Sequence, residues 1–313
     1  MIKRMILQRF LQMIVVLLLL SFVTFLLMRL APGDPVKELL RADEMTVTIE
    51  EEQQLREKLG FDQPLLVQYG HWFFNVLRFD FGQSYISNES VITEIINHLP
   101  ATIIVTIGSL IVMIMISVPL GILSALHQNG WIDHLGRIVA LIGASIPTFW
   151  LALLFIQFFS VKLSLFPTMG GDGFIHYILP SVTLGIAMAA IYARLIRSTL
   201  LDSLQKPYVQ MAEFRGLKKN TILFRYALRE SLLPILSLLS MTVSSLLGGT
   251  VVIEVIFSLP GLGRLIIDAI MQRDYPLIQG YVLLIGVLVI VLNLVVDLLQ
   301  YMLNPYMRLK EEK

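Results

Sequence analysis

The chain has 313 residues, of which 56% are hydrophobic and 15% charged, and its formal net charge is +1. This balance, with a mean hydropathy of +0.76, excludes an ordinary soluble domain, and nothing in the charge indicates nucleic-acid binding. The absence of cysteine excludes disulfides, thiolate catalysis and cysteine-based metal sites.

Six segments lack Asp, Glu, Lys and Arg, and each is close to the length of about 20 residues that a helix needs to cross a bilayer. They are Phe10–Met28, Ala101–Leu126, Ile138–Val161, Tyr177–Ala193, Ser231–Ile253 and Tyr275–Val296. A spanning segment must satisfy its backbone hydrogen bonds internally. The sequence therefore predicts an all-α integral membrane protein with six transmembrane helices, in preference to buried helices of a large soluble core.

Residues 1–30 are predicted to form a short tail and the first transmembrane helix. The segment is not read as a signal peptide, because its apolar core is too long and "RLAPGDP" lacks a small-residue cleavage site.

Residues 31–99 are predicted to form an external segment with short helices. Thr48 and Glu51 have capping-box spacing and Gly60 provides a stop, so a surface helix is expected between them. Leu65–Phe79 mixes aromatic residues with His71 and Arg78, which suits a helix at the membrane interface. A small external subdomain packed on itself is an equally good interpretation.

Orientation follows from the positions of Lys and Arg. Basic residues gather in the first tail, in the loop of residues 194–230, and in the predicted C-terminal tail, residues 304–313. With six crossings these three regions lie on one side of the membrane. Both termini are therefore predicted to be cytoplasmic.

Residues 100–303 are predicted to form a five-helix core that includes a cytoplasmic loop, residues 201–230. Pro207 suits the first turn of a short helix, and Gly216 suits the residue just past its end. A second helix is expected over Thr221–Leu233, continuing into the fifth span through Pro234. A short helix joined stiffly to two spans can transmit force, although a basic loop that only sets orientation has the same composition.

Catalytic motifs are missing from the sequence. There is no phosphate-binding loop, nucleophile elbow or H-E-x-x-H pair, so neither an enzyme nor a cofactor is predicted. No metal site is predicted from the five scattered histidines, although His71, His98 and His176 leave a weak external metal hypothesis open. Asn293 and Asp297 share one face of the last helix, and an interhelical hydrogen bond is the preferred role for this pair. A transporter body without an energy source implies that another subunit provides the energy.

Several motifs resemble those of the dipeptide, oligopeptide and nickel permeases of bacterial ABC importers. The strongest is "GGTVVIEVIFSLPGLGRL" at Gly248–Leu265, followed by "RDYPLIQG" at Arg273–Gly280. "LAPGDP" (Leu30–Pro35) and "LGFDQPLLVQY" (Leu59–Tyr69) extend the resemblance over nearly the whole chain. "QMAEFRGLKK" is similar to the coupling motif E-A-A-x-x-x-G, with Ala212 and Gly216 in matching positions and Gln210 in place of the glutamate.

The resemblance implies a type I ABC importer permease in the bacterial cytoplasmic membrane. It implies a heterodimer with a second homologous permease, two ATPase subunits that hydrolyse ATP, and an extracytoplasmic solute-binding protein. The residues implied to couple to the ATPases are Gln210, Met211, Ala212, Glu213, Arg215, Gly216 and Lys218.

The external hallmark of the family corresponds to Glu254, Pro260, Gly261, Gly263, Arg273 and Asp274. Its prolines and glycines are expected to shape a turn beneath the docked binding protein. Glu254 is expected to cap a helix or pair with Arg264, in preference to contacting the substrate.

For the substrate, "FSVKLSLFPTMGGDGFIHYILPS" (Phe159–Ser181) and "GHWFFNVLRFDFGQSY" (Gly70–Tyr85) look most like nickel members. Nickel, free or bound to a small organic metallophore, is therefore the expected substrate, and a di- or oligopeptide is the alternative. A membrane scaffold or sensor that does not transport is the remaining interpretation.

Overall fold

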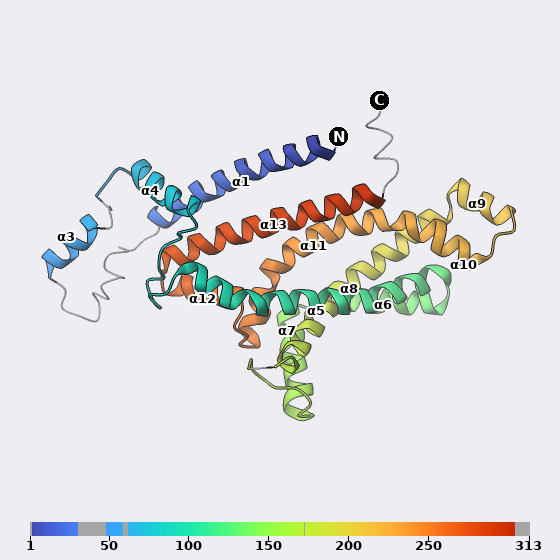
Figure 1. Ribbon diagram of the computed structural model, residues 1–313. Helices are drawn as coiled ribbons and strands as arrows, with labels where there is room; N and C mark the ends of the chain where they lie inside the picture. Colours follow the sequence, from blue (N-terminus) through green and yellow to red (C-terminus); the bar gives the residue numbers. More distant parts are fainter. Residues whose placement is uncertain (1, 31–47, 59–61, 172, 304–313) are drawn as a thin grey trace. The chain divides into compact units, whose positions relative to one another are not determined.

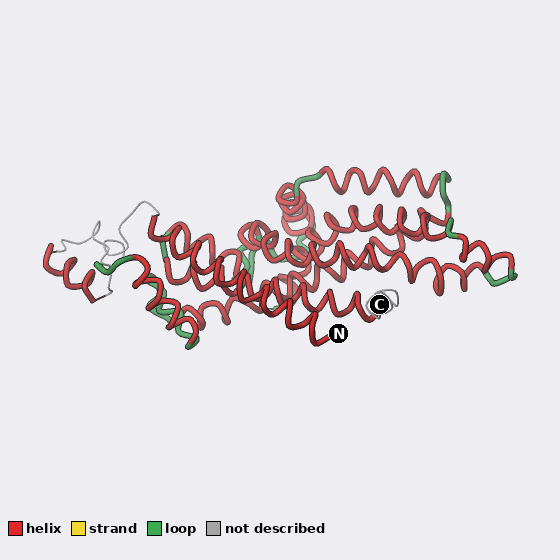
Figure 2. Tube along the Cα trace, turned by 90° about the horizontal axis from the view of Figure 1, so that it is seen from above, coloured by secondary structure: helices red, strands yellow, loops and turns green. Residues whose placement is uncertain are grey.

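The computed structural model describes residues 2–30, 48–58, 62–171 and 173–303, and these residues are almost entirely helical (Figures 1 and 2). Residues 1–100 with 264–291 form one compact unit, and residues 101–263 with 292–313 form a second. The predicted motif "LAPGDP", the stop at Gly60 and the C-terminal tail lie, entirely or mostly, outside the described residues.

The first unit contains α1 (Ile2–Leu30), α3 (Ile49–Lys58), α4 (Leu65–Leu77) and the beginning of α5 (Val91–Leu126), together with most of α12 (Leu262–Met271) and the first part of α13 (Tyr275–Leu303). The helices predicted after Thr48 and over Leu65–Phe79 are confirmed as α3 and α4. An aromatic cluster joins α1 to α4, because Tyr69 packs edge-on against Phe22 and stacks with Phe73 of its own helix. Its hydroxyl is also 2.8 Å from that of Ser21.

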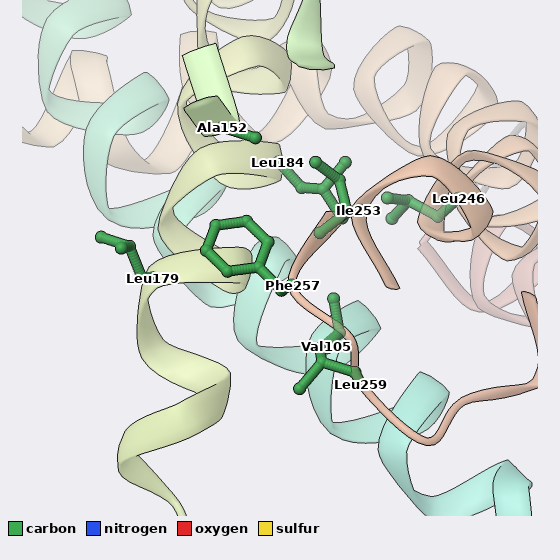
Figure 3. Packing of buried hydrophobic residues seen from close by; sticks show 8 residues of the cluster. All are labelled: Val105, Ala152, Leu179, Leu184, Leu246, Ile253, Phe257 and Leu259. Carbon is green, nitrogen blue, oxygen red and sulfur yellow. The ribbon is translucent and has the colours of Figure 1, made fainter. Parts of the chain in front are cut away.

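The second unit contains the rest of α5, then α6 (Trp131–Ser145), α7 (Thr148–Phe155), the π-helix η1 (Ile156–Lys162) and α8 (Ile175–Leu204). The chain continues through α9 (Pro207–Phe214), α10 (Lys219–Thr221) and the π-helix η2 (Ile222–Ala227) to α11 (Leu228–Ile256). A core cluster of this unit draws side chains from α5, α7, α8, α11 and the turn after α11 (Figure 3): Val105, Ala152, Leu179, Leu184, Leu246, Ile253, Phe257 and Leu259.

Four helical segments among the described residues are long and apolar enough to cross a membrane: Leu11–Leu30, Val91–Leu126, Ile175–Leu204 and Tyr275–Gln300. The fifth predicted stretch lies within the 29 residues of α11. The total of six spans and the orientation of the termini remain predictions.

The third predicted span is not one straight helix. The helix Trp131–Ser145 and the segment Thr148–Lys162, which joins α7 to η1, meet at an angle of 97°, so the predicted span over Ile138–Val161 is broken before Pro147. Ile146 has the extended backbone (φ −79°, ψ 123°) that a following proline imposes, and α6 ends there, before Pro147. Pro119, by contrast, lies inside the continuous α5.

A buried ion pair joins the start of α6 to α8. Asp133 is fully buried and accepts two hydrogen bonds from Arg197, Nε to Oδ1 at 2.5 Å and the second guanidinium nitrogen to Oδ2 at 2.7 Å. The backbone N–H of Asn129 also donates to Oδ2 at 2.9 Å. This two-pronged geometry satisfies a carboxylate that would otherwise be costly to bury, and the sequence analysis did not anticipate it.

Candidate functional site

The predicted coupling residues lie on and after α9, between α8 and α11 (Figure 1). As predicted, Pro207 occupies the first turn of the helix. The helix ends at Phe214 with Arg215 as its C-cap, and the next residue, Gly216, has a φ of +75° in the left-handed region. The N–H of Leu217 donates to the carbonyl of Ala212 at 3.3 Å, and that of Gly216 to Glu213 at 2.9 Å. This pair of bonds is a Schellman motif, which favours glycine at the left-handed position.

One side of α9 is packed into the second unit. Val209 and Ala212 are buried with Ile222 of η2, and Leu204 and Tyr226 cover the same cluster. Lys206 forms an ion pair with Glu230 at the start of α11. The alanine of the coupling motif is therefore a packing residue, and α9 is attached directly to the helix that follows it.

The opposite side of α9 exposes apolar side chains at helical spacing. Tyr208, Met211 and Phe214 are 45%, 56% and 86% exposed, and we call these three residues the coupling face. Gln210, Glu213, Arg215 and Lys218 are exposed around it. An exposed apolar stripe with a polar rim is typical of a protein–protein contact. The motif in the sequence indicated the rim residues and Met211 but not Tyr208 and Phe214, although the three apolar residues recur every third position.

Two of the hallmark glycines, Gly261 and Gly263, lie against the carboxylate of Glu254, which is fully buried near the end of α11. Thr102 on α5 donates its hydroxyl proton to Oε1 at 2.7 Å, and the backbone N–H of Gly263 donates to Oε2 at 2.6 Å. The N–H of Leu262 in turn donates to the Thr102 hydroxyl oxygen at 2.8 Å. Glu254 and Thr102 thus satisfy the first N–H groups of α12, where a negative charge is also favoured by the helix dipole.

The chain between α11 and α12 turns sharply so that Glu254 can reach α12. Ser258 has a left-handed φ of +53°, and the N–H of Leu259 donates to the Glu254 carbonyl at 2.8 Å. Pro260 and Gly261 follow in this turn. A side chain at Gly261 would overlap the Glu254 carboxylate, so the small residue leaves room for the cap.

We expect Gly263→Ala to destabilise this turn strongly. The added Cβ would overlap the backbone of Val251 and lie 2.8 Å from Oε2 of Glu254, and backbone cannot rotate out of the way. Overpacking of this kind costs about 1–3 kcal/mol or more, so the apparent melting temperature of the purified protein should fall. Gly248→Ala, on α11 with no atom within 4 Å of the added Cβ, is the matched control. Equal melting temperatures for the two variants would contradict the expectation.

Arg273 and Asp274 lie at the turn between α12 and α13, in the first unit. Asp274 is fully buried. Ser84 donates to its Oδ2 at 2.5 Å, and the N–H of Leu277 donates to Oδ1 at 3.2 Å. Arg273 has a φ of +54° at the helix end. Asp274 thus caps the start of α13 and attaches the loop containing Ser84 to this helix.

Asn293, one member of the predicted polar pair on the last helix, is bonded to α11 within the second unit. Ser240 donates to Oδ1 of Asn293 at 2.7 Å, and Gln300 donates to the Ser237 hydroxyl at 3.4 Å. Asp297 lies on the same helix and is half-buried. Hydrogen bonds of this kind join membrane helices where apolar contact alone is not selective.

No group of three or more His, Asp and Glu side chains that could hold a metal ion occurs in the described ranges. His98 and His176 each have a ring nitrogen close to a backbone carbonyl, those of Glu94 and Met169.

Comparison with known proteins agrees with the motifs. Residues 117–309 match the family described as binding-protein-dependent transport system inner membrane component, and residues 1–106 match the N-terminal region of such components. The chain is 39% identical over 307 residues to the glutathione transport system permease protein GsiC of Salmonella typhimurium, which covers 97% of this chain and 99% of the relative. It is 40% identical over 306 residues to the nickel import system permease protein NikB of Staphylococcus aureus, covering 97% and 92%.

Among solved structures, a chain from the MetNI methionine ABC transporter in an inward-facing conformation aligns with a TM-score of 0.58 and 18% identity. It covers 68% of this chain and 97% of its own length. At 18% identity, this similarity shows that the two chains share a fold and nothing more. Since the family match covers most of the sequence and two relatives align over nearly its whole length, the chain belongs to the inner-membrane permease components of binding-protein-dependent ABC importers, of the dipeptide and nickel type.

Proposed function

We propose that this permease forms half of a translocation pathway, with a second homologous permease as the other half. The coupling face of α9 supports docking of a partner most directly, because its apolar side chains are exposed while the other side of the helix is packed on η2 and α8. Two ATPase subunits would each dock on such a face, one on each permease. An extracytoplasmic binding protein would deliver the substrate on the side of Glu254 and Asp274.

Closure of the ATPases would move α9, and its packing on η2 would carry that movement into α11. This is rigid-body switching between outward- and inward-facing states, biased by nucleotide. Two features support direct transmission: the Lys206–Glu230 ion pair and the buried cluster of Val209, Ala212 and Ile222. The π-helical turn at η2 is a form of helix that is frequent at functional sites.

For the substrate we propose nickel, free or as a complex with a small organic chelator. The sequence segments around Gly70–Tyr85 and Phe159–Ser181 support it, as does the similarity to a nickel import permease. A peptide, including a glutathione-like one, is the alternative, supported by a relative of nearly equal identity.

Uptake in a strain that lacks this chain tests the proposal. We expect the deletion to remove most energy-dependent uptake of radioactive nickel, supplied with and without histidine as a chelator, and a plasmid copy to restore it. A labelled dipeptide measured in the same cells separates the alternative, because loss of peptide uptake alone would overturn nickel. If uptake of every solute is the same in the deletion strain and in a strain whose partner ATPase is defective as in the parent strain, the result would instead support a scaffold that does not transport.

A further inference from the structure

A cavity of about 390 Å³ lies within the first unit, where the end of α1, α4, the loop after α4 and the start of α13 meet. Its size is in the range of small-molecule sites. Aromatic walls come from Trp72 and Phe25, whose rings are 5.8 Å apart between centroids.

The loop that forms one wall is held in place by its own hydrogen bonds. The Ser84 N–H donates to Glu89 at 2.9 Å, and the Val91 N–H donates to Gly82 at 3.1 Å. The Ser84 side chain is anchored on Asp274 at 2.5 Å. Left-handed backbone at Gly82 and Asn88, with φ of +84° and +57°, completes the turn. The wall is thus held in one conformation by its own backbone and side-chain hydrogen bonds.

Carboxamide groups from three elements converge on this cavity. The side chain of Gln279, on α13, is only 7% exposed and lines the cavity. A carboxamide in such a place is stabilised by a ligand that satisfies its hydrogen-bonding groups. Asn75, Gln83 and Asn88 add further carboxamides to the lining. Carboxamides donate and accept at once, so this set matches the amide group of a peptide.

Two opposite charges also line the cavity. The guanidinium of Arg29 lies 5.3 Å from the centroid of the Phe25 ring, which orients it by a cation–π contact. Asp80 accepts from the Gly82 N–H at 3.0 Å through Oδ1, and its carboxylate has a second oxygen. Tyr85 adds a hydroxyl group to the lining. Burial raises the pKa of Tyr85 to about 12, so its hydroxyl remains a neutral donor at physiological pH.

We propose that this cavity binds a free zwitterionic ligand of the amino-acid or short-peptide class. The ligand carboxylate is held by Arg29 and the Tyr85 hydroxyl, its ammonium by Asp80, and its amide by Gln279. The permease thus carries a substrate-recognition site of its own, in addition to any selectivity of a partner binding protein. An amino-carboxylate chelator has the same end groups as a dipeptide, so the shared chemistry defines the site.

Direct binding to the purified full-length chain in detergent tests this inference. Trp72 lines the cavity, and replacing Trp131 and Trp150 by phenylalanine leaves it as the sole tryptophan of the three in the sequence. We expect alanyl-alanine to change its fluorescence saturably, and histidine, as a zwitterionic chelator, to compete. N-acetyl-alanyl-alanine amide, which lacks both charges, should bind at least about tenfold more weakly.

Variants locate the site. Arg29→Gln and Gln279→Met should each weaken alanyl-alanine binding by about tenfold or more, because each removes a buried or charged hydrogen bond. Arg29→Lys should retain part of the affinity. Gln272→Met, on an exposed glutamine outside the lining, is the matched control for Gln279→Met. All variants are compared only if they elute as the parent protein does in size exclusion.

Two outcomes would overturn the inference: no saturable change into the millimolar range, or equal affinity for the zwitterionic and capped dipeptides. Either result would show that the cavity is not a zwitterion site. Equal affinity for the two dipeptides would mean that the fluorescence change does not depend on the charges of the ligand. The binding measurement involves neither an ATPase nor transport, so a negative result does not contradict the proposed importer function. Conversely, a negative uptake experiment would not change the binding result.

Discussion

Replacing Glu254 by leucine is expected to destabilise the permease more than any other single substitution considered for the external hallmark. Leucine removes the acceptor of the Thr102 hydroxyl and of the Gly263 N–H, both of which are buried. Each buried donor left without a partner costs about 1–3 kcal/mol. The favourable charge at the start of α12 is lost as well. A total of about 3 kcal/mol or more should lower the apparent melting temperature in detergent by several degrees.

The loss of stability should depend on how many acceptor atoms the substituted side chain keeps. Glu254→Gln keeps one oxygen but presents an NH₂ group to one of the two donors, so an intermediate loss is expected. Asp268→Leu is the control on α12, because Asp268 is exposed and its contact with Arg264, at 3.8 Å, contributes little. If Glu254→Leu were as stable as this control while uptake was lost, Glu254 would act on the substrate or partner instead of as a helix cap.

Placing a charge on the coupling face is expected to abolish uptake while leaving the protein in the membrane. Phe214 is 86% exposed, so Phe214→Glu costs the isolated permease little stability. In the importer it would place an unpaired carboxylate in an apolar contact, a penalty of several kcal/mol. Uptake and co-purification of the ATPases should both fall at least about tenfold. Both quantities are measured against membrane content by immunoblot.

Two further variants sharpen this test. Phe174→Glu makes the same change at a 74% exposed phenylalanine before α8 and should leave ATPase association intact. Gly216→Val places a β-branched residue at a φ of +75°, so it should distort the end of α9 and lower uptake without any change to the coupling face itself. Full uptake in both Phe214→Glu and Gly216→Val would exclude α9 as the coupling element.

The helix that carries the predicted coupling residues could be read from the sequence almost to its ends. Pro207 and Gly216 act on the backbone of their own neighbours, so their effect does not depend on the rest of the fold. The choice of contact residues was less complete. Ala212 is buried and Phe214 is exposed because η2 packs on one side of α9, and that packing is not encoded in the eight residues of α9 alone.

The sequence by itself determined which segments are apolar enough to enter a membrane, where α9 begins and ends, and the family to which the motifs belong. These are properties of composition and of neighbouring residues. Only the tertiary structure decided that Thr102 shares the cap of α12 with Glu254, 152 residues away, and that Ser84 anchors on Asp274 at a separation of 190 residues. It also decided that Gln279 lines the same cavity as Trp72. Such contacts depend on how helices pack after they form, because a side chain finds its partner through the fold and not along the chain.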